Sequence, residues 1–99
     1  MILGRYKQRP YDKRKRGIDY TDFLISGEAI AEIVSVTIAP TTTTPFVVDQ
    51  MTIDPAGLLI AYYAGGGESP NEYSAKIRVR TSLNQYREDE VFFEVEDEA

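Results

Sequence analysis

The sequence predicts an all-β sandwich of about six or seven strands with an extended N-terminal arm. Residues 73–81 alternate between apolar and polar or charged side chains, which is the pattern of a strand with one buried face. Apolar stretches of strand length recur along the chain, and turns rich in Gly, Pro and Thr separate them. Residues 1–17, by contrast, hold Pro10 and Gly17 and too few apolar side chains to pack into a core.

The corner before residue 73 favours an immunoglobulin-like sandwich. Gly65, Gly66 and Gly67 precede a strand that opens with Tyr73. In immunoglobulin-like domains a tyrosine at such a corner bonds through its hydroxyl to nearby backbone. The glycine run lacks the Gly-Lys-Ser/Thr ending of a phosphate loop and leads into a strand instead of a helix. We therefore interpret these four residues as a structural corner.

Runs of apolar and β-branched residues between turn signals predict the other strands. The stretch 29–38 is rich in such residues, although its first half also fits a short helix. The stretch 58–64 is continuously apolar, which predicts a strand covered on both faces. The predicted strands are residues 18–24 (a strand, or a strand ending in a turn), 29–38, 46–53, 58–64, 73–81 and 90–96.

The last two predicted strands suggest a hairpin with a definite register. Folding about Tyr86 would place Arg78 opposite Glu94, and opposite charges across a strand pair are stabilising. The same register would pair Lys76 with Glu96 and Arg80 with Phe92. The residues expected inside the sandwich are Tyr73, Ile77, Val79, Val91, Phe93 and Val95.

The composition argues against an enzyme. The chain has no Cys and no His, which removes thiolate zinc sites, the commonest metal ligand and the commonest general base at neutral pH. The carboxylate pairs, such as Asp19 with Asp22, fit no calcium-loop pattern and are interpreted as solvated or strand-pairing groups. We expect no catalytic residue, cofactor or metal. No apolar run approaches ~20 residues, so we expect no membrane span.

Charge is distributed unevenly along the chain. Residues 1–16 hold seven basic residues and one acidic residue, whereas the remainder holds four basic and fifteen acidic residues. A chain with such asymmetry usually has a partner of opposite sign. We interpret residues 1–17 as an arm that binds a partner and 18–99 as the sandwich. The predicted partner-binding residues are Arg5, Tyr6, Lys7, Arg9, Tyr11, Lys13, Arg14, Lys15 and Arg16.

Two partners fit a basic arm with interleaved tyrosines. Phosphate contacts and base stacking would suit nucleic acid. Acidic protein surface, including the acidic strand 90–98 of a neighbouring copy, would suit it equally well in charge. The acidic remainder of the domain would repel a phosphate backbone, so we favour a protein partner and keep DNA as the alternative.

The order and spacing of several short motifs resemble small immunoglobulin-like virion proteins of tailed bacteriophages. A Trp is usual near the first strand of that family, where this chain has Tyr20 or Phe23, and the basic run 13–16 is heavier than usual. The matching segments are Lys7 to Pro10, Asp19 to Leu24, Gly27 to Ile30, Gly65 to Gly67 and Tyr73 to Thr81.

The resemblance implies a structural protein without enzymatic activity, present in several copies on a virion and made in the cytoplasm of a bacterial host. Such a protein decorates or stabilises the capsid, or serves as a head–tail accessory, by binding neighbouring capsid, neck or tail subunits. The N-terminus, Met1-Ile2-Leu3 followed at once by polar residues, lacks a signal peptide's apolar core and fits this expectation.

Overall fold

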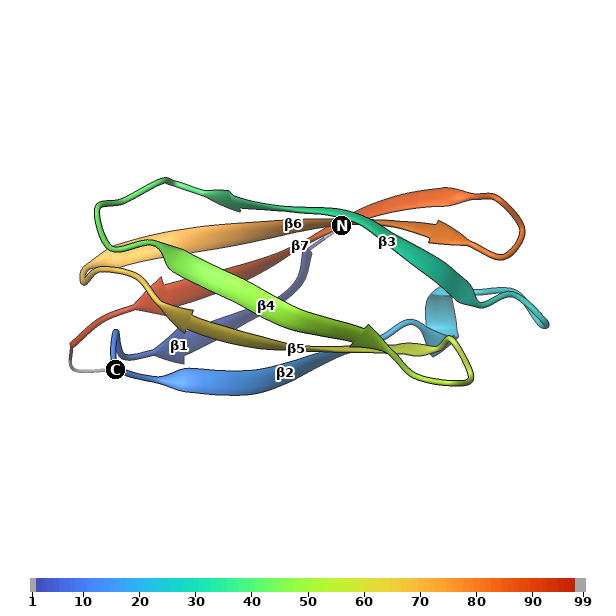
Figure 1. The fold of residues 1–99 in the computed structure, drawn as a ribbon, viewed down its shortest axis with the longest axis horizontal. Coiled ribbons are helices and arrows are strands. Elements are labelled where there is room, and N and C mark those ends of the chain that lie inside the picture. Colours follow the sequence, from blue (N-terminus) through green and yellow to red (C-terminus); the bar gives the residue numbers. More distant parts are fainter. Residues whose placement is uncertain (1, 98–99) are drawn as a thin grey trace.

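The computed structural model describes residues 2–97, which form seven strands and one short 3₁₀ helix in two packed sheets (Figure 1). The elements are β1 (Ile2–Gln8), β2 (Lys13–Asp19), η1 (Thr21–Phe23), β3 (Ile30–Ala39), β4 (Phe46–Ile53), β5 (Leu59–Gly66), β6 (Asn71–Thr81) and β7 (Tyr86–Val95). The all-β sandwich predicted from the sequence is therefore confirmed.

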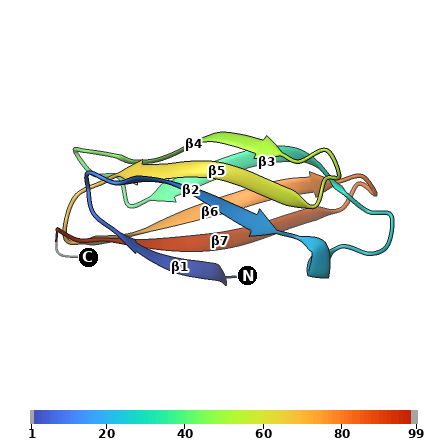
Figure 2. The same cartoon turned by 90° about the horizontal axis from the view of Figure 1, so that it is seen from below.

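The strand order is immunoglobulin-like. One sheet has the order β1-β7-β6-β3 and the other has the order β2-β5-β4. All neighbours run antiparallel except β1, which pairs in parallel with β7. The order therefore matches that of a seven-stranded immunoglobulin domain in which the first strand has joined the sheet of the last. Figure 2 shows the two sheets as separate layers, with β1 and β2 on the same side of the sandwich.

The core lies between the sheets, and alternation along the strands fills it. All six residues expected inside are buried, and the fully buried ring of Phe93 packs between Tyr6 of β1 and Phe46 of β4 at centroid distances of 5.6 and 4.8 Å. The other buried apolar residues come mainly from β2, β4 and β5 and from the segments beside them: Ile18, Tyr20, Ile30, Phe46, Ile60, Tyr62, Ala64 and Ala75.

The corner before β6 positions Tyr73. Its hydroxyl accepts a hydrogen bond from the backbone N–H of Glu68 at 2.9 Å and lies 2.8 Å from the hydroxyl of Thr42. Gly67 has a φ of +85°, and a Cβ there would lie 2.9 Å from the Tyr73 ring. Glycine thus lets the backbone turn and the ring approach at the same position.

The expectation of an extended arm over residues 1–17 is wrong. Residues 2–8 form β1 along β7, and residues 13–19 form β2 along β5. The low apolar content suggested a segment that does not pack. Both segments are edge strands, however, with a neighbouring strand on one side. Their inward positions are filled by Tyr6, Gln8 and Arg16, whose aliphatic or aromatic parts cover the core although they count as polar.

Three finer expectations are also wrong. The β6–β7 hairpin turns between residues 81 and 86, so Arg78 lies opposite Glu88 instead of Glu94, and Lys76 and Arg80 lie opposite Glu90 and Tyr86. The last strand, expected over 90–96, begins earlier, at Tyr86, so that Arg87 to Asp89 are strand. The Asp89 carboxylate is fully buried 2.8 Å from the Arg87 Nε. The third expectation concerns β5, which was expected to be covered on both faces. Its outer face is only partly covered, and Leu59 is 45% exposed.

Candidate protein-binding surface

The residues predicted to bind a partner are divided by the fold into three groups. Arg5 and Lys7 lie on the outer face of the four-stranded sheet, where each has an acidic partner. The Arg5 guanidinium lies 2.7 Å from the Glu72 carboxylate, and the Lys7 ammonium lies 3.8 Å from that of Glu94. These two cations are therefore part of a largely neutralised surface.

A second group lies inside the opening between β1 and β2. The Arg16 guanidinium lies 4.1 Å from the centroid of the Tyr6 ring and donates to the Gln8 side-chain oxygen at 3.3 Å. Gln8 in turn donates to the Ala64 carbonyl oxygen of β5 at 3.2 Å. These three side chains therefore connect β1, an edge strand of one sheet, with β2 and β5 of the other sheet.

The third group is on the surface of β2 and the loop before it. Tyr11 is 97% exposed at the loop, where the Arg9 backbone N–H donates to the Asp12 carboxylate at 3.1 Å. Lys13 lies 3.6 Å from the Asp49 carboxylate. Arg14 and Lys15 are exposed, and neither they nor Arg16 take part in an ion pair within residues 2–97. We call Lys13, Arg14, Lys15 and Arg16 the basic edge.

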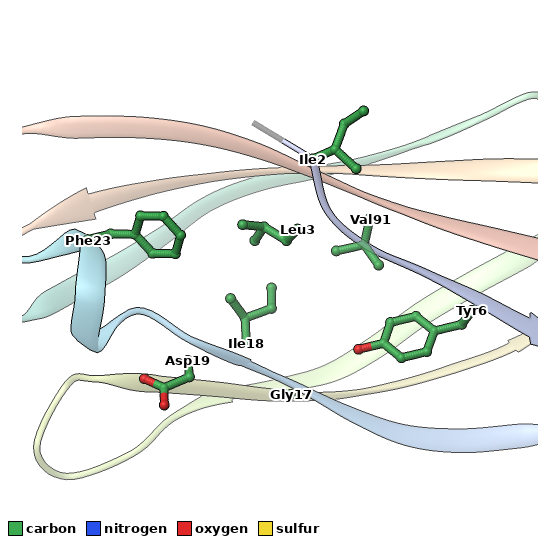
Figure 3. Close-up of a pocket in the computed structure, with 8 residues that line it drawn as sticks. All are labelled: Ile2, Leu3, Tyr6, Gly17, Ile18, Asp19, Phe23 and Val91. Atoms are coloured by element: carbon green, nitrogen blue, oxygen red, sulfur yellow. The ribbon is translucent and has the colours of Figure 1, made fainter.

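A cleft of about 220 Å³ opens beside the basic edge, where β1 and β2 diverge. Figure 3 shows that Leu3 of β1, Ile18 of β2 and Phe23 of η1 direct their side chains into the same space, with Val91 of β7 next to Leu3. Ile2, also at this cleft, is 56% exposed. Asp19 and Tyr6 also line the cleft, so apolar side chains share it with one carboxylate and one phenol next to a row of cations.

Two tyrosines in the layer beneath remain neutral at physiological pH. Burial, followed by the nearby Asp89 carboxylate, raises the pKa of Tyr20 to about 12. Burial also raises the pKa of Tyr62, although the Arg16 guanidinium opposes that change. Neither ring therefore supplies a negative charge to Arg16.

Two negative findings concern the described part of the chain. Within residues 2–97, no three His, Cys, Asp or Glu side chains are grouped so that they could hold a metal ion. None of the helices described there is long and apolar enough to cross a membrane.

Sequence reasoning found the basic residues but missed the cleft. Leu3, Phe23 and Val91 are separated by up to 88 positions in the chain, and only the packing of β1, η1 and β7 brings them together. The one local signal is Gly17, which follows the basic run and also lines the cleft.

Comparison with protein families identifies a virion component. A search of curated proteins found no match. The family model described as "Podophage GP4 fiber-tail adaptor protein gp77" matches residues 8–95, a span that includes every strand from β2 to β7. The chain therefore belongs to the podophage fiber-tail adaptor family, whose members are structural components of the phage particle.

Proposed function

We propose that the protein is a non-enzymatic adaptor of a phage particle that binds neighbouring subunits through the basic edge. The observation that carries this proposal is the position of the cations that form no ion pair within residues 2–97. Arg14, Lys15 and Arg16 follow one another on a single strand, whereas Arg5, Lys7, Arg78 and Arg80 all have carboxylate partners. A surface with unneutralised charge is complementary to an acidic protein surface and increases the rate of encounter with it.

The family description gives the proposal its context. A fiber-tail adaptor joins a tail to its fibers, so we propose that the partner is a tail or fiber protein and that several copies are present on each particle. The sequence led us to expect a protein that binds neighbouring capsid or head–tail subunits and decorates or stabilises the particle; a partner in the tail or its fibers moves the proposed contact to the tail. In either case the sandwich is the rigid body and the basic edge is the contact.

Binding of DNA is the weaker alternative. Lys13 is already paired with Asp49, so a short row of three unpaired cations remains on a domain of net charge −5. If DNA did bind through this row, its affinity would fall with salt along a log–log slope of about −2 to −3. Fluorescence polarisation with labelled DNA at several salt concentrations measures that slope directly.

Incorporation into particles tests the proposal. The variant carries Lys13→Gln, Arg14→Gln and Lys15→Gln, and it is supplied to a phage that lacks its own copy of the protein. The matched control carries Lys76→Gln, Arg78→Gln and Arg80→Gln, which removes the same charge from the outer face of β6. We expect the β2 variant, quantified by mass spectrometry of purified particles, to be depleted and the β6 variant to be retained.

Equal incorporation of the two variants would refute the basic edge as the contact. Because exposed charge pairs are screened over about 8 Å at physiological ionic strength, raised salt should also release the wild-type protein from particles. Circular dichroism and thermal unfolding of both variants confirm that each has folded before the particles are compared.

A further inference from the structure

We infer that an extended acidic segment of the partner protein adds to the free edge of β2 as an eighth strand, with an apolar side chain in the neighbouring cleft. The inference rests on the proposed function and specifies how the partner is held. Main-chain hydrogen bonds would provide the alignment, and the cleft and the cations would select the sequence.

The first argument is that β2 has a free edge and a regular register. β2 is the outermost strand of its sheet and pairs only with β5. Its register is regular along all seven pairs that the structure describes, from Lys13 to Asp19. The three other edge strands, β1, β3 and β4, each contain a register shift. Bulges protect an edge from further pairing, so β2 is the edge most able to accept another strand.

The register also shows which backbone groups are available. The Tyr20 N–H donates to the Leu58 carbonyl oxygen at 2.8 Å, so Tyr20 and Leu58 form a hydrogen-bonded pair. Hydrogen-bonded and non-hydrogen-bonded pairs alternate along an antiparallel ladder. Lys15 and Gly17 therefore belong to non-hydrogen-bonded pairs with β5, and their N–H and C=O groups point to the free edge.

Side chains on the two faces of this edge define the chemistry of the partner segment. Lys13 and Lys15 lie on the outer face, while Arg14 and Arg16 lie on the face that leads to the interior, followed by the buried Ile18. An added strand would place acidic side chains beside the cations on both faces. Where it passes Ile18, an apolar side chain would enter the cleft (Figure 3).

Charge explains how the edge avoids unwanted pairing. Lysines on an edge strand repel other edges and keep a protein soluble. An acidic segment removes that repulsion, whereas a neutral or basic one does not. The same residues thus exclude general aggregation and admit one class of partner.

A proline at Gly17 tests the inference. Gly17→Pro removes an N–H that points to the free edge and takes no part in the ladder with β5, and proline is tolerated in edge strands at such positions. Gly17→Ala is the matched control, because its Cβ would have only an ordinary contact of 3.5 Å with the Ile60 carbonyl oxygen. Purified proteins are titrated onto particles produced without this protein, and binding is measured by co-sedimentation.

We expect Gly17→Pro to bind at least about fivefold more weakly than wild type, and Gly17→Ala to bind as wild type. If Gly17→Pro does not fold, Lys15→Pro removes the equivalent N–H two residues earlier. Wild-type binding by a folded proline variant would overturn strand addition. The charge-neutralised β2 variant separates the two proposals: if it alone fails to bind, the basic edge is a contact without an added strand.

Two further results would also overturn the inference by identifying another occupant. Sedimentation velocity of the isolated protein could show a dimer that Gly17→Pro abolishes, in which case a second copy occupies the edge. Binding to particles that disappears after nuclease treatment would identify nucleic acid as the occupant instead.

Discussion

The β1–β2 region and the β6–β7 hairpin both belong to the sandwich, but only the sequence of the hairpin has the alternation that predicts buried strands. In β6, buried residues alternate with half-buried or exposed ones from Tyr73 to Thr81. In β2, Ile18 is the only buried residue among the seven residues of the strand. β6 lies between two neighbours, whereas β1 and β2 each have one.

The difference shows that an edge strand can be built with polar residues when their stems cover the core. Tyr6 stacks on Phe93, and the Arg16 guanidinium stacks on Tyr6 in turn. The same polar residues leave charge at the surface, which an apolar strand could not do. In this protein the region that looks least like part of the fold is therefore both structural and the candidate for binding.

Deletion of residues 1–17 should have the largest effect on this comparison. The deletion removes β1 and most of β2, exposing the inner faces of β5 and β7, including Tyr62 and Phe93. We expect loss of the cooperative thermal transition, followed by circular dichroism. A truncated chain that unfolds cooperatively at the wild-type midpoint would show that the region is an appendage after all.

Phe93→Ala should have the next largest effect. Phe93 is fully buried and contacts Tyr6 and Phe46, so its removal leaves a cavity and should cost about 3–5 kcal/mol in the free energy of unfolding. The neighbouring Phe92 points to the outer face, under the Arg5 guanidinium. Phe92→Ala should cost less than about 1 kcal/mol. Chemical denaturation of both variants tests whether the two faces of β7 differ in this way.

Gln8→Ala should reduce the stability less, and it tests whether a polar residue of the β1–β2 region contributes to the free energy of unfolding. Gln8 is 2% exposed and bonds to the Ala64 carbonyl and to Arg16. Its loss should reduce the free energy of unfolding by about 1–3 kcal/mol. Gln85→Ala, at the exposed β6–β7 turn, is the control and should change it by less than about 0.5 kcal/mol. Equal effects would argue that Gln8 fills space without holding the sheets together.

The smallest effect should come from the outer face of the β6–β7 hairpin. The Arg78 Nε lies 2.6 Å from the Glu88 carboxylate, so a double-mutant cycle on this pair should give a coupling of about 0.2–1 kcal/mol. The hydrogen bond from Arg78 lowers the pKa of Glu88, so the contribution of the pair should be lost as pH falls through that lowered value. A cycle on Arg78 and Glu94 should give no coupling, because the two are not opposite each other.

The register of this hairpin shows how far sequence reasoning reaches. The sequence placed Arg78 opposite Glu94, six positions from its true partner Glu88. Six is an even number, so every side chain remained on its correct face and the predicted core was right. Alternation determines faces, whereas the position of the turn determines partners. Here the turn contains Asn84, which has a φ of +60°. The residues around Asn84 are also polar, so the sequence did not show that the turn lies at this position.

The fold class and the inward faces of β6 and β7 could be predicted from the amino-acid sequence, as could the turn that leads into Tyr73. Each of these depends on local periodicity or on residue type. Packing was needed to show that residues 2–8 and 13–19 are strands and that a cleft lies between them. It also showed that Arg14, Lys15 and Arg16 form no ion pair within residues 2–97. These features depend on residues that are distant in the chain. The backbone hydrogen bonds of β1 and β2 are made with β7 and β5. Carboxylates from other strands neutralise Arg5 and Lys7 but form no ion pair with Arg14, Lys15 or Arg16 within residues 2–97.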